Sequence, residues 1–321
     1  MNDSIPAMCS KLRELLEESV KRNFSDGILL SGGLDTSILT AIATRYSSLK
    51  AFTVAFEEAP APDVKYATLI AHRFGLKHLV TYFGEHELYD AIRNVVKVMK
   101  SFDPMEIRNS VAIYVGLSAM KEHGISMAMT GDGCDELFGG YSFLFNLKKT
   151  QLDLELQKLW DVMQFSSIPL ANSLGLEARL PYLDPEFKSY AMTLDSRHKV
   201  RNDGGKIWGK WIVRKAFEGL LPDEIVWRVK TPIEYGSGTT VLTRLFGSKI
   251  PDAEFDEKRR KYLDKDKVII QDKEQLFYYE VYTSVLGVPH PSDLNGRICP
   301  RCNSNVPAKA VHCQVCGAYP I

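Results

Sequence analysis

Two glycine-containing segments carry the side chains best suited to phosphate chemistry. The first, residues 31–37, has the sequence Ser-Gly-Gly-Leu-Asp-Thr-Ser and follows an apolar run that ends at Leu30. If a helix begins there, its unpaired backbone N–H groups and the nearby hydroxyl groups can bind a phosphate-type anion. Asp35 would repel that anion unless a divalent cation lay between them, so the segment predicts Mg²⁺ together with phosphate. The lysine of a Walker-type loop is absent, which favours a pyrophosphate-binding loop; a helix-capping Gly-Gly turn is the alternative.

The second segment, residues 130–141, reads Thr-Gly-Asp-Gly-Cys-Asp-Glu-Leu-Phe-Gly-Gly-Tyr. Its three carboxylates, on Asp132, Asp135 and Glu136, would repel one another without a cation. Together with Asp35 they predict a magnesium site built from two loops. A solvated acidic turn is the alternative for this segment taken alone.

The pattern of the chain places both segments after strands. Apolar runs predict strands at residues 27–30, 50–56, 78–83 and 125–129. Helical spacing of apolar residues predicts helices at 10–23, 36–47, 63–74, 87–99 and 109–123. This alternation predicts an α/β fold with a parallel sheet, in which ligands bind at the carboxyl ends of the strands.

From about residue 145 the strand pattern fades. Helices are predicted at residues 147–165, 186–192, 208–220 and 273–286, and the charge-dense residues 251–275 predict a solvated helix face or connector. We therefore expect one large domain over residues 1–290, with its α/β part at about 1–145 and a helical part at about 146–290. A separate small domain is expected at residues 297–321.

Composition narrows the class of protein. The 321 residues include 40 Lys plus Arg and 40 Asp plus Glu, and this zero net charge argues against wholesale binding of polyanions. The longest mostly apolar run, residues 111–120, is half the ~20 residues that a membrane helix needs. The first residues lack the pattern of a secretory signal. A cytoplasmic protein without membrane contact is expected.

Four of the six cysteines form two Cys-x-x-Cys pairs near the C-terminus; they are Cys299, Cys302, Cys313 and Cys316. This spacing predicts a zinc ribbon, whose closed shell of four thiolates makes Zn²⁺ structural, and it is favoured over disulfides in a reducing compartment. So short a segment cannot bury enough core by itself, so metal binding should be coupled to folding. His312 is expected to be a bystander, and the positive charge of the tail is weak support for contact with RNA or a carrier.

The two loops also resemble known motifs. Residues 31–37 resemble the PP-loop of the ATP pyrophosphatases, and residues 130–141 resemble the acidic, glycine-rich signature of the synthetase domain of asparagine synthetases. Residues 107–110, 175–184 and 227–230 match the same family in order and approximate spacing. The resemblance covers residues ~20–240 and implies a sheet of the adenine-nucleotide α-hydrolase type.

The resemblance implies adenylate-forming amidation. ATP and a carboxylate, aspartate in the namesake enzymes, give an acyl-adenylate and pyrophosphate, and ammonia then displaces AMP. By matching position, Mg²⁺ would lie on Asp35 and Asp135, Arg108 would face the substrate, and Lys230 would neutralise the phosphates. Asp132, often Glu in the family, is the candidate to accept a proton from the attacking amine. The expected ATP and pyrophosphate site comprises Leu29, Ser31, Gly32, Gly33, Asp35, Thr36, Ser37, Val54 and Gly131.

Glutamine-using members of the family begin with a glutaminase domain that has an N-terminal Cys nucleophile, whereas this chain opens with Met1-Asn2. The nitrogen is therefore expected to come from free ammonia or from a separate glutaminase subunit. Two alternatives remain for the function. The same chemistry could amidate another carboxylate, on a modified metabolite, a carrier or a tRNA, or the chain could be a nucleotide-binding regulatory protein without turnover.

Overall fold

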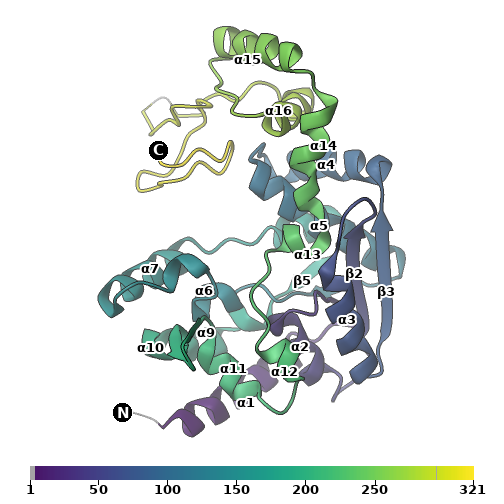
Figure 1. The fold of residues 1–321 in the computed structure, drawn as a ribbon, viewed down its shortest axis with the longest axis vertical. Helices are drawn as coiled ribbons and strands as arrows, with labels where there is room; N and C mark the ends of the chain where they lie inside the picture. The colour runs from purple at the N-terminus through teal and green to yellow at the C-terminus, as the bar shows by residue number, and fades with distance from the viewer. Residues whose placement is uncertain (1–3, 294) are drawn as a thin grey trace. The chain divides into compact units, whose positions relative to one another are not determined.

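The computed structural model describes residues 4–293 and 295–321. Its main sheet has five strands in the order β3-β2-β1-β4-β5 (Figure 1). In chain order these strands are β1 (Gly27–Leu29), β2 (Lys50–Phe56), β3 (Lys77–Phe83), β4 (Met127–Met129) and β5 (Glu177–Arg179). β1 pairs in parallel with both β2 and β4, and β4 pairs in parallel with β5. The predicted parallel α/β sheet is confirmed.

Helices make up most of the remaining regular structure. The longer α-helices are α1 (Ile5–Arg22), α2 (Leu34–Ala43), α3 (Pro62–Arg73), α4 (Glu85–Met99), α5 (Pro104–Glu122), α7 (Lys149–Val162), α9 (Pro185–Thr193), α14 (Leu242–Lys249), α15 (Asp252–Asp266) and α16 (Lys273–Leu286). The shorter ones are α6 (Cys134–Phe138), α8 (Ser167–Ser173), α10 (Ser196–Lys199), α11 (Trp211–Phe217), α12 (Asp223–Val226) and α13 (Ile233–Ser237). Three 3₁₀ turns, η1 (Ser142–Leu144), η2 (Pro181–Leu183) and η3 (Thr239–Val241), and a hairpin of β6 (Arg201–Asp203) and β7 (Lys206–Trp208) complete the set.

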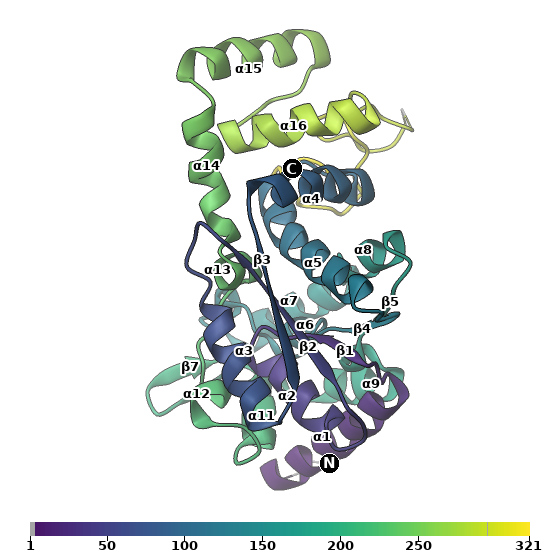
Figure 2. The same ribbon diagram turned by 90° about the vertical axis from the view of Figure 1, so that its right-hand side faces the viewer.

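The strand order reverses beside β1. The chain first builds β1, β2 and β3 toward one edge, and then returns to add β4 and β5 on the other side of β1 (Figure 2). In open α/β sheets this reversal opens a crevice outside the carboxyl ends of the two strands concerned. The loops that follow β1 and β4 therefore occupy the position where this fold binds ligands.

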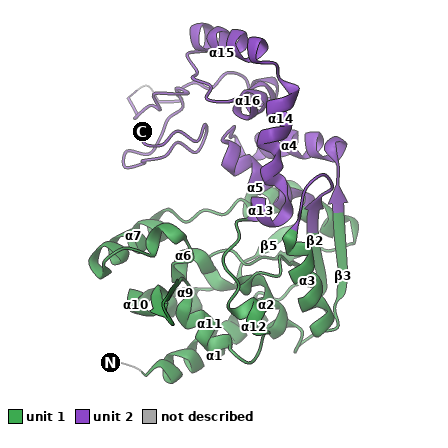
Figure 3. Ribbon diagram, in the orientation of Figure 1, with its two compact units in different colours: residues 1–53, 62–81, 116–232 green, residues 54–61, 82–115, 233–321 purple. Residues whose placement is uncertain are grey.

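The chain forms two compact units (Figure 3). The first comprises residues 1–53, 62–81 and 116–232, and the second comprises residues 54–61, 82–115 and 233–321. The boundaries cross β2, β3 and α5, so each unit is built from several stretches of sequence. The cysteine-rich tail, residues 297–321, belongs to the second unit. The domain division expected from sequence stays a prediction.

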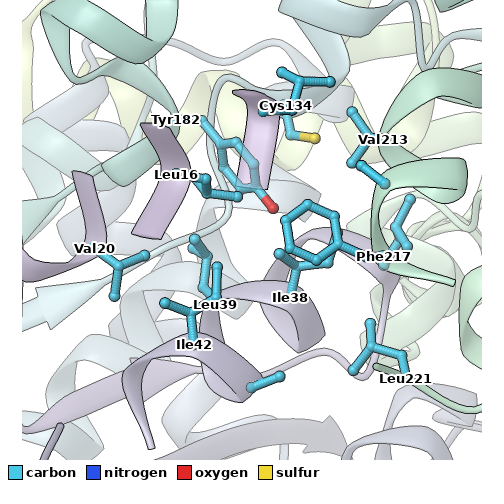
Figure 4. Packing of buried hydrophobic residues seen from close by; sticks show 14 of the residues in the cluster. Leu16, Val20, Ile38, Leu39, Ile42, Cys134, Tyr182, Val213, Phe217 and Leu221 are labelled. Atoms are coloured by element: carbon cyan, nitrogen blue, oxygen red, sulfur yellow. The ribbon is translucent and has the colours of Figure 1, made fainter. Parts of the chain in front are cut away.

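The core of the first unit forms where α1, α2 and α11 meet the sheet (Figure 4). In α1, Leu12, Leu16 and Val20 recur every four residues and are almost fully buried, so the helix presents one continuous apolar stripe. Ile38 and Leu39 of α2 pack into the same cluster. Because α2 begins at Leu34, within the 31–37 segment, this packing holds that segment at the end of β1.

The core of the second unit is built by α4, α14 and α16, which pack against one another. Phe246 and Phe277 stack with their ring centroids 4.2 Å apart, and Tyr278 meets Phe246 edge-on. α15, by contrast, has no buried residue, so residues 252–266 of the charge-dense segment form the predicted solvated helix, whereas Glu274 and Gln275 at the end of that segment are buried.

The largest differences from the sequence prediction lie after residue 145. Strand β5 joins the main sheet, and the β6–β7 hairpin precedes α11, although neither was predicted. Both consist of three-residue strands rich in charged side chains, which give no apolar run to detect. Because Trp208 belongs to the hairpin, α11 begins at Trp211 and not at the expected residue 208. Among the described residues, the structure contains no helix with the length and apolar character needed to cross a membrane.

Candidate active site

Residues 30–33 connect β1 to α2, and residues 34–37 form the first turn of that helix. Gly33 is its cap residue and makes no side-chain cap hydrogen bond, so the first N–H groups remain available to an anion. The hydroxyl groups of Ser31 and Thr36 lie 3.2 Å apart, and Ser31 Oγ also accepts from Gly33 N. The hydroxyl of Ser37 is buried and has no hydrogen-bond partner in the described part of the chain. The loop thus gathers donors in the arrangement expected for pyrophosphate.

Close packing against α3 explains the first glycine of this loop. Gly32 has a φ of +64°, and a Cβ there would lie 2.3 Å from backbone atoms of Tyr66 and Ala67. Any side chain would push the loop away from α3. Glycine therefore fixes the course of the backbone from β1 into α2.

The loop after β4 brings a second aspartate to the first. Asp35 Oδ2 and Asp135 Oδ1 each lie 2.6 Å from the Nζ atom of Lys210, so the two carboxylates are no farther apart than twice that distance. Gly131 lies against the side chains of Asp35 and Thr36, which shows that the two loops are in contact. Two carboxylates that are 100 positions apart in the sequence thus share one lysine.

Lys210 is almost fully buried, with 4% of its side chain exposed. Burial alone would lower its pKa, but the carboxylates of Asp135 and Asp35 outweigh that effect and raise it. Burial would likewise raise the pKa of Asp135, but Lys210 and Lys230 hold it well below its usual range. Gly140 makes room for this pair, because a Cβ there would lie 1.7 Å from Asp135 Oδ1.

Lys230 supplies a second ammonium group, which forms an ion pair with Asp135 Oδ2. Its side chain is 35% exposed, far more than that of Lys210. We call the group formed by Asp35, Asp135, Lys210 and Lys230 the acidic centre. Its two carboxylates and two ammonium groups have no net charge, and one of the ammonium groups is accessible to solvent.

Arg228 fixes the segment that carries Lys230. Its Nη2 atom donates to Asp63 Oδ1 at 2.7 Å, and its Nη1 atom donates to the carbonyl oxygen of Ser31 at 3.3 Å. The guanidinium also lies 3.9 Å from the ring centroid of Tyr66. Arg228 thereby attaches the Lys230 segment to both α3 and the 31–37 loop.

The oxygen atoms of the acidic centre are suitable ligands for Mg²⁺. Oδ1 of Asp35 is buried and accepts no N–H or O–H hydrogen bond within the described residues. Asp135 Oδ2 becomes available when the solvent-accessible Lys230 moves away. Carboxylate oxygens are the ligands that Mg²⁺ prefers in proteins, and it keeps its remaining positions for water and phosphate. The residues present therefore fit the ion.

The other two carboxylates of the second loop point to different partners. Asp132 Oδ2 accepts from the hydroxyl groups of Thr130 and Ser167, and burial raises the pKa of Asp132. Glu136 accepts from Tyr141, and burial raises its pKa as well. The loop thus does not form a single acidic cluster: Asp135 pairs with Lys210 and Lys230, whereas Asp132 is held by two hydroxyl groups and has a raised pKa.

Two of the expected site residues, Arg108 and Val54, belong to the second unit. Arg108 lies on α5, where Nε pairs with Glu234 and Nη1 donates to Glu274 Oε2 at 2.8 Å. Thr243 also donates to Glu274 Oε2. The guanidinium is therefore held on two sides by carboxylates that sequence analysis did not connect with it.

The four tail cysteines form one buried cluster, which we call the cysteine cluster. Their Sγ atoms all lie within 4.8 Å of one another, and the pairs Cys299–Cys316 and Cys302–Cys313 are 3.7 Å apart. Four sulfur ligands at ~2.3 Å from a tetrahedral ion would be about 3.8 Å apart, whereas a disulfide requires ~2.05 Å. The cluster has the dimensions of a tetrahedral metal site. His312 instead contacts Asp103.

A family model for asparagine synthase matches residues 11–168 and 169–270 of the chain. The chain belongs to the asparagine synthase family. The matched ranges include all five segments on which the resemblance was based, so the expected family is confirmed.

Curated relatives agree with this assignment. Asparagine synthetase B [glutamine-hydrolyzing] of Escherichia coli is 29% identical over 309 residues, which are 88% of this chain and 55% of the relative. An asparagine synthetase [glutamine-hydrolyzing] of Sandersonia aurantiaca is 34% identical over 260 residues, 73% of this chain and 49% of the relative. The chain thus spans about half the length of the curated relatives it matches.

Among solved structures, an NMN synthetase from Francisella tularensis aligns with a TM-score of 0.31 at 14% identity, over 60% of this chain and 94% of that one. The α/β fold follows from the parallel pairing of the strands and from their order in the sheet.

Sequence analysis missed Lys210, Glu234 and Glu274. Lys210 had one signal: it is a charged residue in an aromatic stretch, Trp208-Gly209-Lys210-Trp211. Flanking aromatic residues indicate that Lys210 is buried, but they do not identify the carboxylates with which it pairs. The two glutamates lie in segments with no motif, so only the structure connects them with Arg108.

Proposed function

We propose that the chain catalyses ATP-dependent, AMP-forming amide synthesis, in the simplest case from aspartate and ammonia to asparagine. One observation carries the proposal: Asp35 and Asp135, from separate loops, meet at Lys210 beside the uncapped start of α2. This arrangement is suited to a metal-bound polyphosphate at the carboxyl ends of adjacent parallel strands. Membership of the asparagine synthase family supports cleavage between the α and β phosphates.

In the first half-reaction, the helix start, Lys230 and Lys210 have separate roles. The N–H groups at the start of α2 and the nearby hydroxyls bind the departing pyrophosphate, and Lys230 leaves Asp135 for the phosphates as their negative charge grows. Lys210 stays buried and keeps the two aspartates together. Asp35 and Asp135 would hold Mg²⁺, whose positive charge would supply neutralisation of the phosphates. The carboxylate substrate displaces pyrophosphate from ATP to give an acyl-adenylate.

The second half-reaction needs a proton acceptor. Ammonia attacks the acyl carbon of the adenylate, the bond to AMP breaks, and the nitrogen must lose a proton. Asp132 is the candidate acceptor, because burial raises its pKa and thus makes its carboxylate a stronger base. Arg108 is proposed to face the substrate carboxylate, with Leu29, Val54 and Gly131 around the adenosine.

Pyrophosphate release tests the reaction class. Purified protein with ATP, Mg²⁺ and ammonium is assayed against a panel of carboxylates, and the nucleotide product is identified. AMP and pyrophosphate are expected only with an accepted acid, and Lys230→Ala should lose this activity while Lys158→Ala, an exposed lysine on α7, keeps it. ADP with phosphate would contradict the mechanism. No turnover with any acid, including aspartate, would favour a regulatory nucleotide-binding protein.

The nitrogen donor is tested separately. We propose free ammonia, or ammonia from a separate glutaminase subunit. Amide formation should therefore depend on ammonium in the purified chain. Steady amide formation from glutamine by this chain alone would refute the proposal. The acceptor panel also tests a modified metabolite, carrier or tRNA-linked carboxylate as the alternative substrate.

We further propose that the cysteine cluster binds structural Zn²⁺. Four thiolates leave no open position on a tetrahedral ion, so the metal would hold the tail together and take no part in catalysis. Contact of the tail with RNA or a carrier stays a prediction. Part of the positive charge of the tail already has partners within it, because Arg297 Nη1 donates to the carbonyl oxygens of Ala308 and Ala310. A cytoplasmic location also remains a prediction.

A further inference from the structure

The cysteine-rich tail belongs to the second unit (Figure 3) and is hydrogen-bonded there to α16 and to the segment that leads into α5. Its 313–316 turn accepts hydrogen bonds from the segment before α5: Phe102 N donates to Val315 O at 2.7 Å, and Ser101 Oγ donates to Gln314 O at 2.8 Å. From α16, Gln275 Nε2 donates to the carbonyl oxygen of Cys316 at 2.8 Å. A single turn of the tail therefore contacts both helices.

Packing makes this junction tight. Phe102 is fully buried, and its ring meets Tyr279 and Tyr282 of α16 edge-on, with centroids 5.2 and 5.3 Å away. Gly317 lies so close to the start of α5 that a Cβ there would be 2.5 Å from Asp103 Oδ1. The tail, the start of α5 and α16 share one packed region, so a change in the tail cannot be absorbed by empty space.

The same two helices carry the Arg108 ion pair. Asp103 begins α5, with its carboxylate accepting from Met105 N and its carbonyl accepting from Ile107 N. Arg108 follows about one turn later. Its partner Glu274 is the chain neighbour of Gln275, which bonds the tail. The tail thus fixes both helices within a few residues of the groups that orient the guanidinium.

We propose that the metal-held tail is a positioning element for Arg108. By fixing the start of α5 and the start of α16, the folded tail sets the orientation of the guanidinium toward the carboxylate substrate. This inference rests on the proposed function in one respect, that Arg108 faces this substrate. Loss of the tail contacts should weaken use of the carboxylate and leave use of ATP unchanged.

Two variants that leave the cysteines intact test the inference. Gln275→Leu and Ser101→Ala each remove a donor to the tail, and Gln157→Leu, on the exposed face of α7, is the matched control. Metal content should stay at the wild-type value in all three. In the first two, amide hydrogen exchange at residues 101–108 should increase and KM for the carboxylate should rise about tenfold, the effect of roughly one buried hydrogen bond. KM for ATP should remain within about twofold.

Cys302→Ser provides an independent test, because loss of the metal should reproduce the faster exchange at residues 101–108. Unchanged exchange in all these variants would overturn the inference. An equal rise in the KM values for ATP and for the carboxylate would also overturn the inference, because it would indicate a general loss of stability. If the wild type released no pyrophosphate, the proposed function would fail, yet the exchange measurement would still decide whether the tail positions α5.

Discussion

The acidic centre of the first unit and the cysteine cluster of the second both gather side chains of types that can bind metal ions, but their charges are balanced differently. In the acidic centre, Asp35 and Asp135 face Lys210 and Lys230, so two negative charges meet two positive ones. In the cysteine cluster, four sulfur atoms face one another within 4.8 Å. Four thiolates at this distance need a cation to balance them.

The difference shows two ways in which a protein uses a metal. The acidic centre keeps its geometry through its own lysines and, under the proposed function, would need Mg²⁺ only for chemistry. A 25-residue tail cannot bury enough apolar area by itself, so the proposed metal would supply folding energy to the cysteine cluster. We therefore expect metal removal to unfold the tail and to leave the fold of the acidic centre intact.

The largest effect is expected from breaking the cysteine cluster. Cys302→Ser should lower the metal content by about one ion per chain and abolish exchange protection over residues 297–321, because structural zinc contributes about 10 kcal/mol or more to folding. Metal analysis with hydrogen exchange measures both. Cys9→Ser, a buried cysteine outside the cluster, is the control and should keep the metal. An unchanged metal stoichiometry in Cys302→Ser would contradict the four-thiolate site.

Next in size is the loss of one carboxylate from the acidic centre. Asp35→Asn keeps the shape of the side chain but removes a charge that would hold Mg²⁺. Pyrophosphate release should fall by about 10²- to 10³-fold, the usual cost of removing one stabilising group from a transition state. Metal in the tail should stay at its wild-type level. Asp26→Asn, an exposed aspartate before β1, should have full activity; equal losses in both variants would argue against a specific role for Asp35.

A third change tests whether the ammonium group of Lys230 occupies the position beside Asp135 that the proposed Mg²⁺ would take. Lys230→Met removes the solvent-accessible ammonium from Asp135, so Mn²⁺ should bind without nucleotide at least about tenfold more tightly, given the Coulomb energy of one charge at this distance. Electron paramagnetic resonance of free Mn²⁺ measures this affinity. Lys158→Met is the control for a simple change in net charge. If both variants bind Mn²⁺ as the wild type does, Lys230 does not shield the site.

The smallest effect concerns a buried lysine with no carboxylate in contact. Lys199 lies 4.3 Å from the ring centroid of Trp160, and its Nζ atom has no hydrogen-bond partner among the residues described. Burial lowers the pKa of Lys199 to about 7, while Asp153 and Asp195 partly oppose that shift. Lys210, buried to a similar degree but paired, has its pKa raised instead.

The sign of the pH effect follows from these shifts. The unfolded chain keeps Lys199 protonated up to about pH 10.5, whereas the folded chain releases the proton near pH 7, so the cost of burying the charge is complete below pH 7 and disappears as pH rises toward 10. Lys199→Met should therefore raise Tm by roughly 5 °C at pH 6 and by little at pH 10. Thermal unfolding at both pH values measures this. A pH-independent difference would mean that folding does not shift the pKa of Lys199.

Much of the fold could be predicted because it depends on local patterns. The apolar run 50–56 coincides with β2, and the spacing of 273–286 coincides with α16. β5 was missed because Glu177 and Arg179 give it no apolar run; the parallel pairing with β4 is what makes it a strand. The charged side chains of this segment have partners at very different distances along the chain: Glu177 pairs with Arg179, whereas Asp184 pairs with Arg22.

By itself, the sequence determined the chemistry of each segment: the donors of the 31–37 loop, the carboxylates of the 130–141 loop and the paired cysteines of the tail. These depend on residues within about 20 positions of one another, where chain geometry limits the outcome. Only the tertiary structure decided which charges meet. Lys210 reaches Asp35 across 175 positions, and Arg108 reaches Glu274 across 166. Burial makes such pairs obligatory, since an unpaired charge in the interior is costly, but only the packed fold selects the partner.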